Sequence, residues 1–147
     1  MNAQILILVF AATPSLAHRT STPCLAGKQA ALVQGHFSGE IFCSRKNASF
    51  ALVGRTAGRS YAIYDYRYHF LPHREGAMHG GQRLVVFRGE SYVGQYMLSP
   101  PPYINVHIEG SRVLLETPQS REKVRLDFSR KPPTRIFING ETEQFDR

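Results

Sequence analysis

Residues 103–117 have the sequence YINVHIEGSRVLLET, and this stretch decides the fold class. Apolar and polar side chains alternate on both sides of Gly110-Ser111, as they do in two β-strands joined by a two-residue turn that begins with glycine. A turn of this length fixes the register, so that one face of the hairpin is wholly apolar. The predicted pairs are Glu109 with Arg112, Ile108 with Val113 and Val106 with Leu115, and Asn105, His107 and Glu116 lie on the other face.

A second predicted hairpin lies upstream of the first. Strands over 83–88 and 91–98 flank a turn at Gly89-Glu90. A two-residue connection between them sets Phe87 opposite Tyr92 and Val85 beside Gly94. Both faces of this hairpin are partly apolar, so we expect it to lie in the middle of a covered sheet.

The C-terminal segments carry the same two-residue period. Residues 122–128 alternate, and 134–138 runs into Asn139-Gly140, which is the strongest short signal for a hairpin. The returning strand over 141–145 is rich in glutamate on the face that should be apolar, so we expect it to be an exposed edge. The side chains predicted to point inward from 122–128 are Val124, Leu126 and Phe128.

Further strands are expected upstream, at 34–42, 49–53 and 60–70, which brings the total to about nine or ten. No window of the chain carries a convincing helical stripe, and residues 26–32 form one short helical turn at most. We therefore predict an all-β fold, an antiparallel meander that forms a small barrel or sandwich. Little or no helix is expected after the N-terminal leader.

Length and composition agree with one compact domain. The chain has 147 residues, of which 42% are hydrophobic and 20% are charged. A chain of this length can bury one core but is too short for two ordinary domains. Its composition excludes disordered, collagen-like, coiled-coil and multi-span membrane proteins.

The first 17 residues resemble a secretory signal peptide. An apolar run over 5–12 is followed by Pro14 and by Ser15-Leu16-Ala17, which has small residues where a signal peptidase cleaves. Cleavage before His18 leaves 18–147 as a single β domain without a transmembrane segment, and places the protein in the periplasm or outside the cell. The segment has no Lys or Arg near its start, so a buried first strand or an uncleaved anchor remains the alternative.

Cys24 and Cys43 are the two cysteines of the chain. An even pair in an exported protein favours one disulfide bond, which would fasten an irregular N-terminal segment to the first strands. Their spacing does not fit a zinc or redox motif. No cofactor is expected from these residues.

The chain is basic, with a formal net charge of +7. Most of its cations are arginine, which suits bidentate contacts with phosphate or carboxylate groups. For an exported protein the expected partner is an anionic component of the cell envelope or an acidic protein, rather than nucleic acid. The cations are scattered and form no long run, so the alternative is that the charge serves only solubility.

The most unusual stretch is YAIYDYRYHF over 61–70. Alternation sets three tyrosines on one face and Asp65, Arg67 and His69 on the other, which we expect to be the wet face. Buried tyrosine hydroxyls need hydrogen-bond partners, so the tyrosine face suits a rim or a polar cavity that binds a ligand. The alternative is a core strand. The candidate ligand-binding residues are Tyr64, Tyr66, Tyr68 and Arg67.

A histidine-containing segment follows this strand. His69, His73 and His79 lie near Met78, and imidazole with thioether is a ligand set that copper accepts. The spacing matches no rigid metal motif, and Arg74 would repel a cation. We therefore expect no metal site, and keep the three histidines as the alternative.

The chain lacks the motifs of common enzyme classes, including GxSxG, HExxH and a phosphate-binding P-loop. The sequence therefore favours an exported, non-enzymatic binding or inhibitor module that acts through a basic, tyrosine-rich β surface or cavity. The first alternative is a structural or assembly protein of the cell envelope, whose exposed strand at 141–145 pairs with a partner. A small hydrolase is the third hypothesis.

Overall fold

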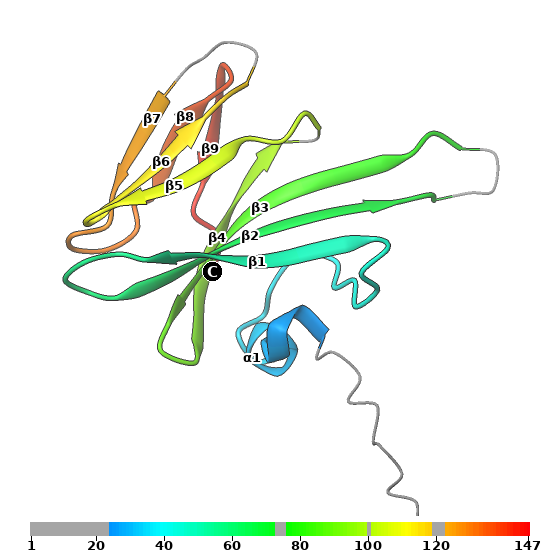
Figure 1. Ribbon diagram of the computed structural model, residues 1–147, viewed down its shortest axis with the longest axis horizontal. Helices are drawn as coiled ribbons and strands as arrows, with labels where there is room; N and C mark the ends of the chain where they lie inside the picture. The colour runs from blue at the N-terminus through cyan, green and yellow to red at the C-terminus, as the bar shows by residue number, and fades with distance from the viewer. Residues whose placement is uncertain (1–23, 73–75, 100, 119–122) are drawn as a thin grey trace, which may run out of the picture.

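The structure, a computed structural model, describes residues 24–72, 76–99, 101–118 and 123–147. The described residues form nine antiparallel strands in three sheets (Figure 1). The first sheet contains β1 (Ala48–Arg55), β2 (Tyr61–Phe70), β3 (His79–Arg88) and β4 (Ser91–Ser99) in that order; the second contains β5 (Asn105–Glu109), β6 (Arg112–Glu116) and β7 (Lys123–Asp127); and the third pairs β8 (Arg135–Ile138) with β9 (Glu141–Gln144).

The predicted all-β meander is confirmed, and its strands pack in a sandwich-like arrangement. The two smaller sheets lie together against one face of the four-stranded sheet (Figure 1). The sheets approach one another at their edges, because β5 contacts β1, β8 contacts β7 and β9 contacts β4. Only isolated hydrogen bonds join these edges, and the bridge between Gln95 and Asp146 is one of them. The described strands therefore form three separate sheets and not one closed barrel.

The turn chemistry of the sequence correctly predicts the register of two hairpins. In β5–β6, the observed pairs include Glu109 with Arg112 and Val106 with Leu115, as expected. In β8–β9, Asn139 and Gly140 have φ values of +54° and +80°, which is the left-handed conformation that a tight hairpin turn of this type requires. Val124, Leu126 and Phe128 point toward the core, as the alternation over 122–128 predicts.

Two details of the predicted strands are wrong. Residues 34–42 form no strand: Gln34 is the last residue of helix α1 (Gln29–Gln34), and residues 35–42 run across the face of the four-stranded sheet instead of pairing with it. In β3–β4, Val85 lies opposite Gln95 rather than Gly94, since a β-bulge shifts the register between Val86 and Phe87. The bulged strand holds Gly94 at a φ of +154°.

The N-terminal part of the described chain covers one face of the four-stranded sheet. It comprises a 3₁₀ turn, η1 (Cys24–Gly27), then α1 and an irregular stretch that reaches residue 44. We call residues 24–44 the cover segment. Figure 1 shows α1 on the opposite side of this sheet from β5–β9. The sheet is therefore covered on both faces, and the predicted leader over 1–17 lies outside the described residues.

Two hydrophobic clusters result from this arrangement. The larger one fills the space between the four-stranded sheet and β5–β9, and includes Tyr96, Ile104 and Phe128. The second lies between the sheet and the cover segment, and includes Leu32 and Tyr66. Because successive side chains of a strand point to opposite faces, β2, β3 and β4 contribute to both clusters.

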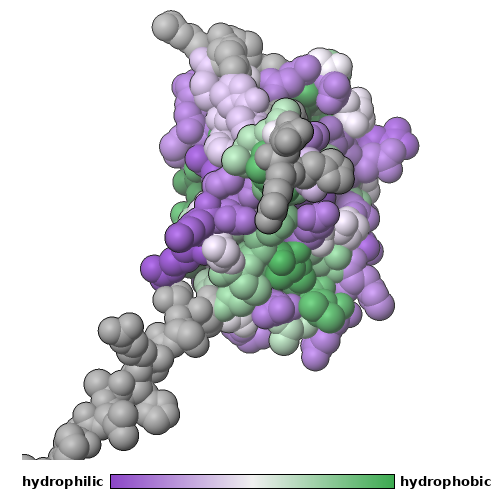
Figure 2. All heavy atoms as spheres, turned by 90° about the vertical axis from the view of Figure 1, so that its right-hand side faces the viewer, coloured by the Kyte–Doolittle hydropathy of each residue, from purple (hydrophilic) through white to green (hydrophobic). Residues whose placement is uncertain are grey.

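The β2–β3 hairpin projects beyond the rest of the sheet (Figure 1). Figure 2 looks onto this end of the molecule, where polar residues surround a smaller apolar area. Leu71 and Met78, which are 47% and 63% exposed, flank the hairpin connection. In the described parts of the chain, no helix has the length and apolar character that a bilayer crossing requires.

Candidate functional site

The tyrosine face of β2 is packed against the cover segment. Tyr66 is fully buried and Tyr64 is 7% exposed, whereas Tyr68 is half-buried. Their rings stack with phenylalanines of neighbouring segments, since Tyr64 lies 4.6 Å from Phe50 and Tyr68 lies 5.5 Å from Phe42 between ring centroids. These tyrosines do not line the cavities beside the disulfide, beside Arg67, beside His79 or around Pro133.

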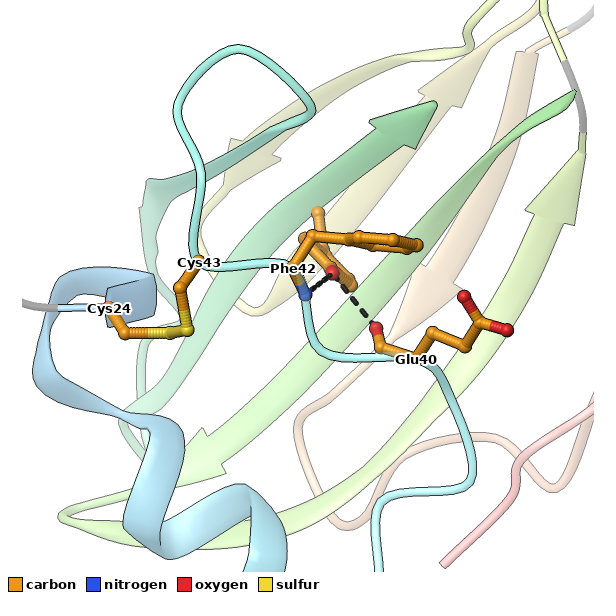
Figure 3. The surroundings of a disulfide bond; sticks show 5 residues. Cys24, Glu40, Phe42 and Cys43 are labelled. Atoms are coloured by element: carbon orange, nitrogen blue, oxygen red, sulfur yellow. Dashed lines mark hydrogen bonds between the residues drawn. A yellow bond between two sulfur atoms is a disulfide. The ribbon is translucent and has the colours of Figure 1, made fainter. Parts of the chain in front are cut away.

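The Tyr66 hydroxyl is fully hydrogen-bonded by the cover segment. It donates to the carbonyl of Glu40 at 2.9 Å and accepts from the amide of Phe42 at 3.0 Å (Figure 3). Burial of this hydroxyl raises the pKa of Tyr66, and the hydrogen bond from Phe42 opposes that shift only in part. Tyr66 therefore fastens the cover segment to the sheet as a neutral side chain at physiological pH.

The predicted disulfide bond joins the two ends of the cover segment. Cys24 and Cys43 are bonded, with their Cα atoms 4.7 Å apart (Figure 3). Cys43 follows Phe42 directly, so the disulfide lies next to the hydrogen bonds that Tyr66 makes. The bond thus closes the cover segment into a ring that lies on the sheet.

The opposite face of β2, expected to be wet, is wet only toward the end of the strand: His69 is exposed and Arg67 is partly exposed, but Asp65 is buried. Asp65 is only 8% exposed, because residues 101–104 cross this face on the way from β4 to β5. Arg67 donates from Nε to Asp65 at 2.9 Å, and Gln82 donates from Nε2 to the other carboxylate oxygen at 2.9 Å. Gln82 also binds the backbone of Ile104, accepting from its amide at 2.7 Å and donating to its carbonyl at 2.8 Å.

Arg67 lies at the edge of this polar cluster and reaches a surface cavity. Its guanidinium contacts Asp65, donates to the carbonyl of Ile104 at 3.3 Å and lies 5.1 Å from the centroid of the Tyr103 ring. Its side chain remains 34% exposed. The cluster therefore holds Arg67 in one orientation while part of its charge faces solvent.

The cavity beside Arg67 has a volume of about 180 Å³, and we call it the arginine notch. Two arginines and one histidine line it, and no carboxylate does. Three parts of the chain converge there: the start of β1 with the turn before it, the end of β2, and the segment before β5. The lining residues are Arg45, Ala48, Ser49, Arg67, His69 and Tyr103.

The donors of the notch suit a single anionic group. Arginine presents planar N–H groups that match a carboxylate or a phosphate, and the hydroxyls of Ser49 and Tyr103 can donate as well. Arg45 is exposed and its side chain meets no acid in the described parts of the chain. The volume is below that of ordinary small-molecule pockets, which begin at about 300 Å³. The notch can therefore hold one charged group of a larger partner.

The predicted histidine group is only partly described, since His73 lies outside the described residues. His69 pairs with Gly80 and His79 pairs with Phe70, so the two imidazoles start from opposite faces of the hairpin. His79 stacks on Phe70 with ring centroids 5.8 Å apart. Both histidines and Met78 nevertheless line a cavity of about 330 Å³. The described residues contain no group of three potential metal ligands.

Comparison with known proteins finds no match to a protein-family model, to a curated protein sequence or to a solved structure. A function for this protein therefore has to be inferred from the geometry of the chain. Of the residues in the notch, the sequence predicts Arg67 as a binding residue and His69 only as an alternative metal ligand. It misses Arg45, Ser49 and Tyr103, whose contribution depends on three distant segments meeting.

Proposed function

We propose that this protein is an exported, non-enzymatic binding module that holds an anionic group of its partner in the arginine notch. The observation that carries the proposal is that Arg45, Arg67 and His69 line one cavity without a carboxylate among its lining residues. The net charge of +7 would favour the approach of an acidic partner to the whole molecule. The disulfide bond is compatible with an oxidising compartment.

The experiment is a titration of the protein with inorganic phosphate and with acetylated triglutamate, followed by NMR. Both anions should shift the backbone amides of Ser49 and His69, and the affinity should fall as salt rises because exposed charges are screened over about 8 Å at physiological ionic strength. Arg45→Ala should weaken binding about two- to fivefold at low salt, the range for exposed ion pairs.

The matched control is Arg59→Ala. Arg59 is exposed in the connection between β1 and β2, at the end of that hairpin far from the notch. The Arg59→Ala substitution lowers the net charge by the same amount as Arg45→Ala. A difference in affinity between the two variants therefore reports a contact at the notch and not the change in net charge. Equal affinities of the two variants, or unshifted amides at Ser49 and His69, would overturn the proposal.

A hydrolase has weaker support. Ser49 and His69 both line the notch, but no hydrogen bond joins their side chains, and no described carboxylate binds His69. Asp65, the nearest acid in sequence, is bonded to Arg67 and Gln82. A serine nucleophile needs a base within hydrogen-bond reach and a third group that orients the base.

An assembly role for the last strand also has weaker support. β9 is four residues long and carries two glutamates, and short charged strands are poor templates for pairing. The residues that follow it are occupied, because Phe145 packs on Tyr96 and Asp146 exchanges backbone hydrogen bonds with Gln95. A free edge elsewhere in the molecule is better suited to strand addition.

A further inference from the structure

β1 is the edge strand of the four-stranded sheet, and one side of it has no strand partner among the described residues. The amide of His69 donates to the carbonyl of Asn47 at 2.8 Å, which fixes the alternation of hydrogen-bonded pairs along β1 and β2. Ser49 and Ala51 then bond to β2, whereas Phe50 and Leu52 direct their backbone N–H and C=O groups away from it. These outward groups are available to another strand.

The free part of this edge is limited to its first half. Ala48 bonds through its amide to the carbonyl of Ser44, but no described segment other than β2 makes a backbone hydrogen bond to residues 49–52. Further along, Ile108 of β5 lies against Gly54, and the amide of Ala57 donates to the carbonyl of Gly110. The second half of the edge is therefore closed by β5.

The first half also lacks the usual protection of an edge. Its sequence over 48–52 is ASFAL, without a charged residue or proline. Natural edge strands are commonly protected from pairing by such residues. Leu52 is 51% exposed, so an apolar side chain lies in solvent beside the outward backbone groups.

Two cavities flank this half-edge, on opposite faces of the sheet. The arginine notch lies on the face of Ser49 and Arg67. A second cavity of about 420 Å³ lies beside the disulfide, on the face of Phe50. It is lined by Leu25, Ala26, Phe42, Cys43, Arg45 and residues 48–51, and thus by no acid. Arg45 borders both cavities.

We propose that the partner is an extended acidic peptide that adds to β1 as a fifth strand of the sheet. Residues of an added strand point alternately to the two faces, so apolar side chains would enter the cavity beside the disulfide and carboxylates would enter the arginine notch. The backbone of the peptide would bond to Phe50 and Leu52. This inference rests on the proposed function and names the partner class for the same notch.

The experiment uses a labelled heptapeptide in which leucine and glutamate alternate, and fluorescence anisotropy with the full mature chain in its disulfide-bonded form. A peptide of the same composition, with three consecutive leucines and the glutamates grouped after them, is the control. The alternating peptide should bind about tenfold more tightly, because only it can place both kinds of side chain while pairing with β1.

Two changes then test the backbone contacts. Leu52→Pro removes an outward N–H and keeps the bonds between β1 and β2, so it should weaken peptide binding about tenfold compared with Leu52→Ala. In the peptide, N-methylation of the leucine amides should abolish binding if the added strand is antiparallel, and methylation of the glutamate amides should do so if it is parallel. This second test needs no altered protein and stands if Leu52→Pro does not fold.

The outcomes separate the two proposals. If both methylated peptides bind as well as the parent, or if the grouped control binds as well as the alternating peptide, strand addition is overturned. If phosphate and triglutamate still shift Ser49 and His69 in that case, the arginine notch remains an anion site and only the peptide partner is wrong. If these small anions also fail to bind, both proposals fall.

Discussion

Gln82 lies fully buried on β3 and binds both backbone groups of Ile104 as well as the carboxylate of Asp65. If this side chain is removed, the three polar groups that it binds lose their hydrogen-bond partner in a buried place. The Gln82 amide therefore holds the segment before β5 onto the four-stranded sheet, together with Arg67, which also donates to the carbonyl of Ile104. Arg67 joins the same cluster, so the orientation of the arginine notch depends on it.

Gln82→Ala should lower the free energy of unfolding by about 3 kcal/mol, because it leaves a cavity and buried groups without partners. Gln144→Ala, at an exposed position of β9, is the matched control and should change the free energy by less than about 0.5 kcal/mol. Denaturant unfolding of both variants measures the difference. Equal midpoints would show that the cluster around Asp65 contributes nothing to stability.

Glu143 has a pKa raised above the ordinary value of 4.5, mainly because it is partly buried and also because Glu141 is close. The folded protein then holds this proton more tightly than the unfolded chain does. Stability should therefore fall as the pH rises from 4.5 through the raised pKa, and stay lower above it.

Glu143→Gln should accordingly raise the melting temperature at about pH 7 and leave it unchanged at about pH 3, where the carboxyl is protonated in both states. Glu141→Gln removes only the smaller, coulombic cause and should give a smaller increase. Thermal melts at the two pH values measure both effects. An increase of the same size at both pH values would contradict a titration of Glu143.

The burial of Asp65 could not be predicted from the alternation of side chains along β2. Alternation correctly predicts that Asp65 and Arg67 share a face of β2 and that Tyr64 and Tyr66 share the other. It does not say what covers a face. Both faces of this sheet are covered by other segments. A charged residue on one face is therefore not necessarily exposed to solvent, and Asp65 is buried together with its partners.

Substitutions on the two faces of the β5–β6 hairpin test whether its register determines which side chains are buried. Val106→Asp would place a carboxylate next to the larger hydrophobic cluster and should lower the free energy of unfolding by about 2–3 kcal/mol. Asn105→Asp, one residue away on the exposed face, should change it by less than about 0.5 kcal/mol. Similar melting temperatures for the two variants would mean that the faces of this strand are assigned wrongly.

The cover segment should depend strongly on its disulfide bond. A bond between residues 19 positions apart stabilises by about 3 kcal/mol in the chain-entropy description, so Cys24→Ser with Cys43→Ser should lose about that much. Denaturant unfolding measures the loss, and mass spectrometry after alkylation without reduction checks the bond in the natural chain. Two alkylated thiols in that sample would contradict the bond.

Hairpins could be predicted from the sequence because their turns carry a local signal. Asn139-Gly140 and Gly110-Ser111 fix the turn, and the turn fixes the register of the strands on either side. The cover segment carries no such signal. Phe37, Ile41 and Phe42 pack onto the sheet from outside, and nothing local in the sequence over 34–42 distinguishes this packing from that of a strand within the sheet.

For the whole molecule, export remains a prediction from residues 1–17. We expect the mature chain to begin at His18 and to be recovered outside the cytoplasm. N-terminal sequencing and the intact mass of the protein from cell fractions measure this directly. A chain that retains residues 1–17 in the cytoplasm, with both cysteines reduced, would contradict the prediction and remove one support of the proposed function.

The arginine notch shows why a site assembled from the whole molecule is hard to predict. Arg67 stands out in the sequence because it interrupts a run of tyrosines. Arg45 and Tyr103 have no local feature that marks them, and they reach Arg67 only because the turn before β1 and the segment before β5 both meet the end of β2. Residues far apart in the chain are brought together by packing, which alternation along single strands does not reveal.

The four-stranded sheet separates two hydrophobic clusters that share no side chain, so one cluster can be exposed to solvent while the other stays packed. If the cover segment detaches in a sub-global opening while β5–β9 stay in place, the amide of Phe42, which donates to the Tyr66 hydroxyl on the sheet, would exchange with deuterium before the amides of β3. In that opened state the rings of Tyr64, Tyr66 and Tyr68 would face solvent together. A ligand for the tyrosine face would therefore bind a minor conformation. Its affinity would be reduced in proportion to the fraction of molecules in which the cover segment is detached.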